Sequence, residues 1–172
     1  MIRIAVTGPE STGKSWLAEN LAAHYHCAWV PEYAREFLAG TKGEYTYNDI
    51  LTIARGQFAG EQQKALEPGS FLFCDTDFVV TRIWCKVKYG KVHPWIRTMS
   101  REHRYDLYLL CNVDLPWEYD PLREHPQMRQ KLFELYTAEL KKLDANFRVV
   151  SGSGEERLVN AVGYVEELLA NR

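Results

Sequence analysis

The stretch that decides the fold is Gly8-Pro9-Glu10-Ser11-Thr12-Gly13-Lys14-Ser15, which follows the apolar run Ile2–Thr7. It matches the pattern G-x-x-x-x-G-K-[ST] at every fixed position. Small residues allow consecutive backbone N–H groups to point at a polyphosphate, and a following helix adds its positive N-terminal end. A ligand-free turn can match this pattern by chance, but its position between a predicted strand and a predicted helix favours a phosphate-binding loop.

The residues of this loop have distinct expected roles. Lys14 should reach the β- and γ-phosphates of a nucleoside triphosphate, and the hydroxyl of Ser15 should ligate Mg²⁺. The other residues expected to contact the nucleotide are Gly8, Glu10, Ser11, Thr12, Gly13 and Trp16. The loop therefore predicts a bound triphosphate with Mg²⁺, but it does not predict the reaction.

Length and composition indicate a single globular domain covering residues 1–172. Apolar residues make up 46% and charged residues 26%, which is ordinary for a soluble protein. Lysine and arginine number 21 against 23 aspartates and glutamates, and the resulting charge of −2 argues against a nucleic-acid-binding protein. The longest apolar runs, such as 71–74 and Leu107–Cys111, are too short to span a bilayer, so no membrane partner is expected.

The cysteine pattern points to a reducing compartment. Cysteines stand at positions 27, 74, 85 and 111, without a Cys-x-x-Cys spacing and without histidines at zinc-finger spacing. They are expected to be reduced and to pack as small hydrophobic residues. The N-terminus also lacks the charged-then-apolar pattern of a signal peptide, so a cytoplasmic location is expected.

Short apolar runs alternate with segments of helical periodicity, which predicts an α/β fold. The runs are almost continuously apolar, as in parallel strands covered on both faces. Strands are expected at Ile2–Thr7, 27–30, 71–74, Leu107–Cys111 and Phe147–Val150. Helices are expected over 14–26, from Thr46 with Asp49 as its capping partner, after Thr76, over 95–103, over 132–143 and from about Ser153. Right-handed crossovers then give a three-layer α/β/α sandwich with a five-stranded parallel sheet and its site at the carboxyl ends of the strands.

Charged residues follow the second and third predicted strands. Glu32 is placed to accept a proton from an attacking hydroxyl, or to lie at a helix N-terminus. Arg35 is a partner for Glu32 or a phosphate ligand. Asp75 is expected to hold Mg²⁺ rather than only to cap a helix. For Asp77 three roles stay open, namely holding a sugar hydroxyl, acting as the base, or starting the helix.

Two later segments are candidate pocket elements. Trp84, His93 and Trp95 lie in a stretch rich in rings, which is typical of a ligand pocket or of core packing. Arg123 and Arg129 flank a turn broken by prolines. This suits a mobile helical lid over about 118–130 that brings guanidinium groups to the transferring phosphoryl group, or else a solvated surface loop.

The ends of the fourth and fifth strands address the base of the nucleotide. Cys111-Asn112-Val113-Asp114 lacks the lysine of the Asn-Lys-x-Asp pattern of guanine-specific GTPases, which favours ATP. Ser151 and Gly152 belong to a loop of small residues, which is a candidate seat for adenine or a helix cap.

Together these segments resemble the ribosylnicotinamide kinase domain of the NadR family. The resemblance rests on residues 8–15, on Pro31-Glu32-Tyr33-Ala34-Arg35-Glu36 and on Asp75-Thr76-Asp77, with further likeness at Gly90-Lys91-Val92-His93-Pro94 and Tyr105-Asp106. It implies a P-loop kinase that transfers the γ-phosphoryl group of ATP to the 5′-hydroxyl of nicotinamide riboside. The chain shows neither the adenylyltransferase domain nor the DNA-binding domain of full-length members, so a kinase acting alone is implied.

The residue positions and the resemblance together give the expected roles in the site. Tyr33, Trp84 and Trp95 are expected to hold the cationic nicotinamide ring by cation–π contacts. The expected catalytic residues are Lys14, Glu32, Asp75, Arg123 and Arg129, and the expected substrate-binding residues are Glu32, Tyr33, Arg35, Asp77, Trp84, His93 and Trp95. Two other interpretations stay open, namely a kinase for another nucleoside or small metabolite and a P-loop ATPase acting as a regulatory switch.

Replacement of Lys14 by alanine is expected to abolish phosphoryl transfer, because the ammonium group of Lys14 neutralises charge on the transferring phosphate. Product formation measured by mass spectrometry, with ATP and Mg²⁺ in excess, checks this expectation. A Lys14→Ala variant that keeps most of the ATP-dependent activity would contradict the role of the loop.

Overall fold

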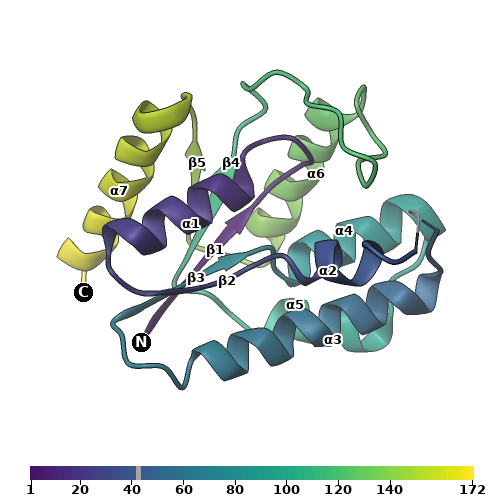
Figure 1. Ribbon diagram of the computed structural model, residues 1–172, viewed down its shortest axis with the longest axis horizontal. Helices are drawn as coiled ribbons and strands as arrows, with labels where there is room; N and C mark the ends of the chain where they lie inside the picture. Colours follow the sequence, from purple (N-terminus) through teal and green to yellow (C-terminus); the bar gives the residue numbers. More distant parts are fainter. Residues whose placement is uncertain (42–43) are drawn as a thin grey trace.

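A computed structural model describes residues 1–41 and 44–172 and contains the expected sheet. Its strands are β1 (Ile2–Thr7), β2 (Ala28–Val30), β3 (Phe71–Asp75), β4 (Leu107–Cys111) and β5 (Phe147–Val150). They are parallel throughout and lie in the order β2-β3-β1-β4-β5 (Figure 1). Ile4 of β1 pairs with Phe73 on one side and with Leu107 on the other, so β1 lies at the centre of the sheet.

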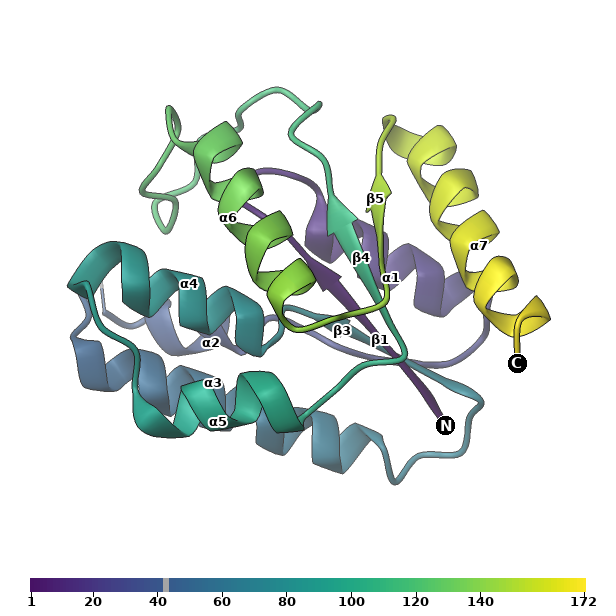
Figure 2. The same ribbon diagram turned by 180° about the vertical axis from the view of Figure 1, so that it is seen from behind.

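Helices cover both faces of this sheet and complete the expected sandwich. On one face lie α1 (Lys14–His24) and α7 (Gly154–Ala170), and on the other lie α4 (Phe78–Tyr89) and α6 (Arg129–Lys142) (Figures 1 and 2). Beside β2, α4 also packs with α2 (Tyr33–Leu38), α3 (Tyr47–Lys64) and α5 (Pro94–Glu102) in a helical layer. Every residue of β3 and β4 is buried, which explains why both strands are apolar without alternation.

The start of α3 shows how local sequence determines an element. The side chain of Thr46 accepts a hydrogen bond from the N–H of Asp49, and the carboxylate of Asp49 accepts one from the N–H of Thr46 at 2.7 Å. This capping box satisfies two N–H groups that the first turn leaves free. It confirms the helix predicted from Thr46.

Two parts of the fold differ from the sequence-based expectation. The short helix α2 was not expected, because six residues show too little periodicity for a pattern to register. The helical lid expected over 118–130 is wrong in its secondary structure, since residues 118–128 form turns and irregular loop and α6 begins at Arg129. Pro116, Pro121 and Pro126 explain this, because each removes a backbone donor and disfavours helix in the residue before it.

All four cysteines are free. Cys74, Cys85 and Cys111 are buried, as expected for cysteines that pack as small hydrophobic residues. None of the described helices combines the length and the apolar character needed to cross a membrane.

Candidate active site

The candidate site is a cavity of about 1140 Å³ at the carboxyl edge of the sheet. Its walls are contributed by the phosphate loop (residues 8–15), the β2–α2 connection, α3, α4 and the 112–128 loop. Of the residues expected from the sequence, those that line it are Gly8, Glu10, Ser11, Thr12, Gly13, Lys14, Ser15, Trp16, Glu32, Tyr33, Arg35, Asp75, Trp84 and Arg123. The fold therefore brings the phosphate loop and the charged strand ends to one space.

The phosphate loop has a backbone that only certain residues allow. Gly8 and Gly13 have φ angles of 135° and 76°, in the region that favours glycine, and Ser11 has a φ of 55°. A Cβ on Gly8 would lie 3.0 Å from the carbonyl oxygen of Cys111, so the loop also needs glycine for close approach to β4. Gly13 offers no side chain to cap α1, and the first N–H groups of this helix are left for an anion.

Lys14 and Asp75 face each other at the base of the cavity. The ammonium group of Lys14 donates a hydrogen bond to the carbonyl oxygen of Pro9 at 2.8 Å. Asp75 ends β3 and is only 1% exposed. Burial and the nearby charge of Glu32 raise the pKa of Asp75 to about 6, although Lys14 and Ser15 act in the opposite direction. Oδ1 of Asp75 has no hydrogen-bond partner among the described residues, so Asp75 and Ser15 are the pair that could hold a divalent cation.

Across the cavity, Glu32 lies at the start of α2. Nε of Arg35 contacts Oε2 of Glu32 at 3.3 Å, and Nη1 of the same arginine donates to Asp120 at 2.8 Å. Arg35 therefore orients the carboxylate of Glu32 and links it to the 112–128 loop. This arrangement fits the ion-pair alternative for Arg35 rather than direct phosphate binding.

The 112–128 loop lies against the phosphate loop. The carboxylate of Glu10 accepts hydrogen bonds from the N–H of Glu124 at 3.1 Å and from that of His125 at 3.0 Å. Oγ of Ser11 accepts one from the N–H of Glu118 at 2.9 Å. These contacts close the top of the cavity, and they occupy the Glu10 carboxylate that was expected to meet the nucleotide.

The two arginines expected to reach the phosphoryl group lie in different surroundings. Arg123 lines the cavity, and its Nη1 donates to Oγ of Ser11 at 3.2 Å. Arg129 does not line the cavity, because its Nη1 donates to the carbonyl oxygens of Ser11 at 3.0 Å and Leu115 at 2.9 Å. Arg129 thus fastens the phosphate loop to the 112–128 loop, and the geometry does not support its expected catalytic role.

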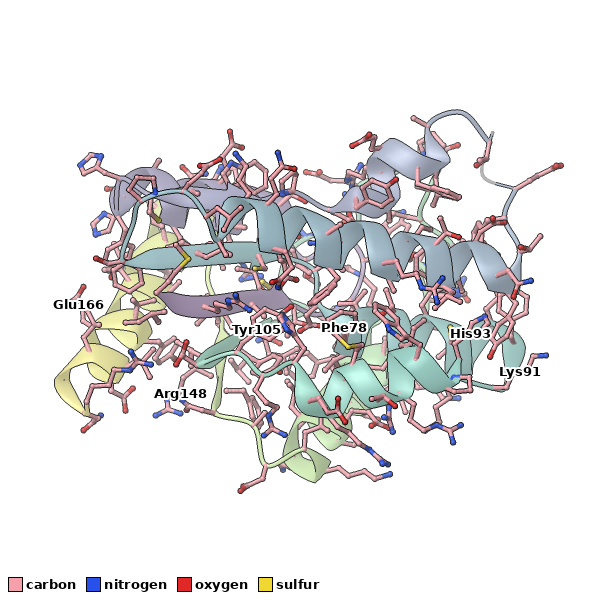
Figure 3. The ribbon with its side chains drawn as sticks, turned by 90° about the horizontal axis from the view of Figure 1, so that it is seen from below. Phe78, Lys91, His93, Tyr105, Arg148 and Glu166 are labelled. Carbon is pink, nitrogen blue, oxygen red and sulfur yellow. The ribbon has the colours of Figure 1, made fainter. Side chains whose placement is uncertain are left out.

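His93 and Trp95 are packing residues in this structure, contrary to the substrate-binding role expected for them. The ring of His93 stacks on Tyr47 with centroids 3.9 Å apart, and Trp95 meets Phe78 edge to face at 5.6 Å. Figure 3 shows His93 with Lys91 at one end of the helical layer, and Phe78 nearer the middle of the molecule. His93 is the N-cap of α5 and Trp95 lies in its first turn, where α5 packs against α3 and α4, and neither residue lines the cavity.

Tyr33 and Trp84 are the expected rings that do line the cavity. Nε1 of Trp84 donates to the hydroxyl of Tyr45 at 2.7 Å, and that hydroxyl contacts Glu124 of the 112–128 loop at 2.5 Å. Sequence reasoning missed Tyr45, because its role depends on two elements that are distant along the chain.

Ser151 and Gly152 lie next to the cavity without lining it. Nδ2 of Asn112 donates to Oγ of Ser151 at 3.0 Å, and the N–H of Gly152 donates to Asp114 at 2.8 Å. Gly154, two residues further on, does line the cavity. The adenine seat in this loop therefore stays a prediction.

Sequence reasoning also missed Arg157, which is 1% exposed in the first turns of α7. Its guanidinium group joins the ends of β4 and β5 to the phosphate loop. Nη1 contacts Oδ1 of Asp114 at 3.0 Å, and the backbone carbonyls that accept from the two terminal nitrogens are those of Thr12, Asn112, Val150 and Gly152. One signal could have found it, since Arg157 precedes the buried Ala161 and Val165 by four and eight positions and so shares their helix face.

Replacement of Arg157 by methionine is expected to lower the free energy of unfolding by about 3 kcal/mol, because it leaves four carbonyls and a carboxylate without their donor. Urea denaturation measures this change. The matched control is Arg148→Met, which removes an exposed pair with Glu167 and should cost less than about 1 kcal/mol. Equal losses in the two variants would contradict the role of Arg157.

Asp77 caps α4 and does not line the cavity, so the substrate-binding role expected for it is wrong in this geometry. Its Oδ1 accepts a hydrogen bond from the N–H of Val80 at 2.9 Å, and the residue is 2% exposed. Of the roles left open by the sequence, starting the helix is the one that the structure supports.

Burial raises the pKa of Asp77 to about 6, from 3.8 in an unfolded chain. Between these two values the folded protein binds the proton of Asp77 more tightly than the unfolded chain does. The free energy of unfolding should therefore fall as pH rises from 4 to 7. Asp77→Asn keeps the capping oxygen and should raise the free energy of unfolding at pH 7.5 by up to about 3 kcal/mol.

Thermal unfolding of both proteins across this pH range, in buffer without metal ions, checks the prediction. Asp49→Asn serves as a comparison of opposite sign, since hydrogen bonds from Thr46 lower the pKa of the exposed Asp49. An Asp77→Asn variant with an unchanged pH profile would contradict the assignment.

Known proteins resemble this chain in sequence and in fold. A family model described as an AAA domain matches residues 3–157. The trifunctional NAD biosynthesis/regulator protein NadR of Escherichia coli (strain K12) is 30% identical over 98% of this chain and 43% of its own length. The chain thus spans less than half the length of this curated relative.

Two solved structures share the fold. A NadR protein in complex with NR has a TM-score of 0.80 at 23% identity, covering 97% of this chain and 51% of that chain. A NadR protein in complex with NAD and AMP-PNP has a TM-score of 0.81 at 24% identity, covering 97% and 49%. These TM-scores establish that the present chain shares the fold of both structures.

Proposed function

This chain belongs to the AAA-domain family and aligns over nearly its whole length with part of the NadR proteins, and on that basis we propose that it transfers the γ-phosphoryl group of ATP to the 5′-hydroxyl of nicotinamide riboside. The observation that carries the proposal is the shared cavity. A phosphate loop with Lys14 forms one wall, and Glu32 and Tyr33 form another. Donor and acceptor can therefore meet inside one space.

The triphosphate is held by the phosphate loop. Inward N–H groups and Lys14 bind the phosphates, and the absence of lysine between Asn112 and Asp114 favours adenine over guanine. Ser15 and Asp75 are suited to hold Mg²⁺, because Oδ1 of Asp75 is buried and unpartnered among the residues that the structure describes. Bound there, Mg²⁺ supplies positive charge that neutralises the developing charge on the phosphates.

On the acceptor side, Glu32 takes the proton from the 5′-hydroxyl group. Arg35 orients its carboxylate, and general-base catalysis of this kind requires the carboxylate within hydrogen-bond reach of the hydroxyl. Nicotinamide riboside carries a cationic ring, which suits Tyr33 and Trp84 at about 0.5–2 kcal/mol for each cation–π contact. The charges of Glu32 and Asp75 favour such a cation over a neutral nucleoside.

The 112–128 loop excludes water from the transfer. It is fastened to the phosphate loop through Glu10 and Ser11, and it presents Arg123 to the cavity. A guanidinium group at this position stabilises charge on the transferring phosphoryl group, and closure prevents hydrolysis of ATP. A cytoplasmic location forms part of the proposal and is supported by the four free cysteines.

The second candidate is a kinase for another nucleoside, which the size of the cavity allows. Incubation of the protein with ATP, Mg²⁺ and one nucleoside at a time, followed by product mass, separates the two. Nicotinamide riboside should give nicotinamide mononucleotide, and ATP should be consumed only slowly without an acceptor. A regulatory ATPase would instead hydrolyse ATP at its full rate with no nucleoside present.

Glu32→Gln is expected to lower kcat by about 10²–10⁴-fold while the KM for ATP stays within about two-fold, because the amide cannot accept the proton. Steady-state kinetics with varied ATP and varied nicotinamide riboside measure both constants. Glu19→Gln on the exposed side of α1 is the matched control and should keep wild-type kinetics. If Glu32→Gln changes only the KM for the nucleoside, Glu32 positions the acceptor and is not the base.

A further inference from the structure

A single side-chain amide links the two segments that carry the facing carboxylates. Gln57 lies on α3 and is 4% exposed. Its Oε1 accepts a hydrogen bond from the N–H of Tyr33 at 2.9 Å, and its Nε2 donates to the carbonyl oxygen of Asp75 at 3.1 Å. The first bond fixes the residue after Glu32, and the second fixes the end of β3. Gln57 therefore sets the separation between the start of α2 and Asp75.

The preceding residue of α3 provides the surface on which Tyr33 rests. A Cβ built on Gly56 would lie 2.6 Å from Cζ of Tyr33 and nearer still to its Cδ1 and Cε1. The tyrosine ring thus lies directly against the backbone of α3, where α2 and α3 run side by side (Figure 1). Glycine in a helix interior is less favourable than alanine. At position 56 the close approach of the Tyr33 ring explains why glycine is present.

Gly60, one turn further along the same helix, shows the contrast. Its Cβ would lie 3.5 Å from Cγ1 of Val30, which is an ordinary van der Waals contact. An alanine fits at position 60 without movement, whereas at position 56 the ring of Tyr33 would have to leave its place. The close approach is therefore specific to Gly56 and Tyr33.

We propose that Gly56 and Gln57 are positioning residues for the acceptor side of the cavity. This inference rests on the proposed function and goes further, because it names what fixes Glu32 and Tyr33 relative to Asp75. Gly56 lets the Tyr33 ring lie directly against the backbone of α3 and leaves room for the planar cationic ring of the nucleoside. Gln57 holds the backbone beside Glu32 at the distance from Asp75 that transfer requires.

The chemistry of Gln57 separates this role from simple space filling. An apolar side chain of similar volume would fill the same place, but it would leave the N–H of Tyr33 and the carbonyl of Asp75 without this partner. A buried amide with both ends bonded gives one fixed arrangement, because any displacement breaks a hydrogen bond of a largely buried group. Misplacement of a reacting group by about 1 Å can cost on the order of 10²-fold in rate.

The first experiment tests Gly56 through stability and does not depend on the substrate. Gly56→Ala should lower the Tm of the protein, whereas Gly60→Ala should leave it unchanged or raise it by about 2–4 °C. In a Tyr33→Ala background, Gly56→Ala should no longer lower the Tm, because the ring that it displaces is absent. A Gly56→Ala variant whose loss of Tm is the same with and without the Tyr33 ring would overturn the role of Gly56.

The second experiment tests Gln57 through kinetics. Gln57→Met keeps the volume but not the hydrogen bonds, and it should reduce kcat/KM for nicotinamide riboside by at least about ten-fold while the KM for ATP stays within about two-fold. The matched control, Gln62→Met at an exposed position of the same helix, should keep both constants.

The outcomes distinguish this inference from the proposed function. If wild-type protein phosphorylates no nucleoside, the proposed function fails, while the Tm comparison of Gly56, Gly60 and Tyr33 variants still decides the packing role of Gly56. If wild-type protein is active and Gln57→Met matches Gln62→Met in both kinetic constants, the positioning role of Gln57 is overturned even where the Tm falls.

Discussion

The site depends on a charged group buried beneath the phosphate loop. A loop whose N–H groups point inward needs backbone angles that an unsupported chain would not hold, as the positive φ angles of Gly8, Ser11 and Gly13 show. Arg157 supports this loop from below by bonding to the carbonyl of Thr12 and to the ends of β4 and β5. The phosphate loop and the strand ends therefore form one rigid edge. A phosphate-binding site on this edge is preorganised before any ligand binds.

Around this edge the charges are arranged for a negative ligand on one side and a positive ligand on the other. In the proposed function, the phosphate loop and Lys14 attract the triphosphate, Asp75 holds the divalent cation, and Glu32 faces the acceptor. Burial, together with the charge of Glu32, raises the pKa of Asp75, so the ionised carboxylate is unfavourable here without a further positive charge. Under the proposed function, a divalent cation and a cationic nucleoside would supply positive charge near these carboxylates.

Local patterns predicted the sheet and the phosphate loop, because each has a signature within a few consecutive residues. A strand buried on both faces is a continuous apolar run, and the phosphate loop has glycine, lysine and serine at fixed spacing. The aromatic stretch was ambiguous for the opposite reason, since nothing local separates Trp84, which lines the cavity, from Trp95, which packs on Phe78. Arg157 bonds to Thr12, which is 145 positions away in the sequence, and Gln57 bonds to Tyr33 and Asp75, which are 24 and 18 positions away. Their roles depend on tertiary placement, and a single sequence gives no measure of it.

The most direct test of this account is a crystal structure of the protein with a non-hydrolysable ATP analogue, Mg²⁺ and nicotinamide riboside. The account predicts phosphates enclosed by residues 8–15, a 5′-hydroxyl group at about 2.6–3.2 Å from the carboxylate of Glu32, and the nicotinamide ring against Tyr33. A riboside bound outside the cavity, or a 5′-hydroxyl group turned away from both Glu32 and the γ-phosphate, would contradict it.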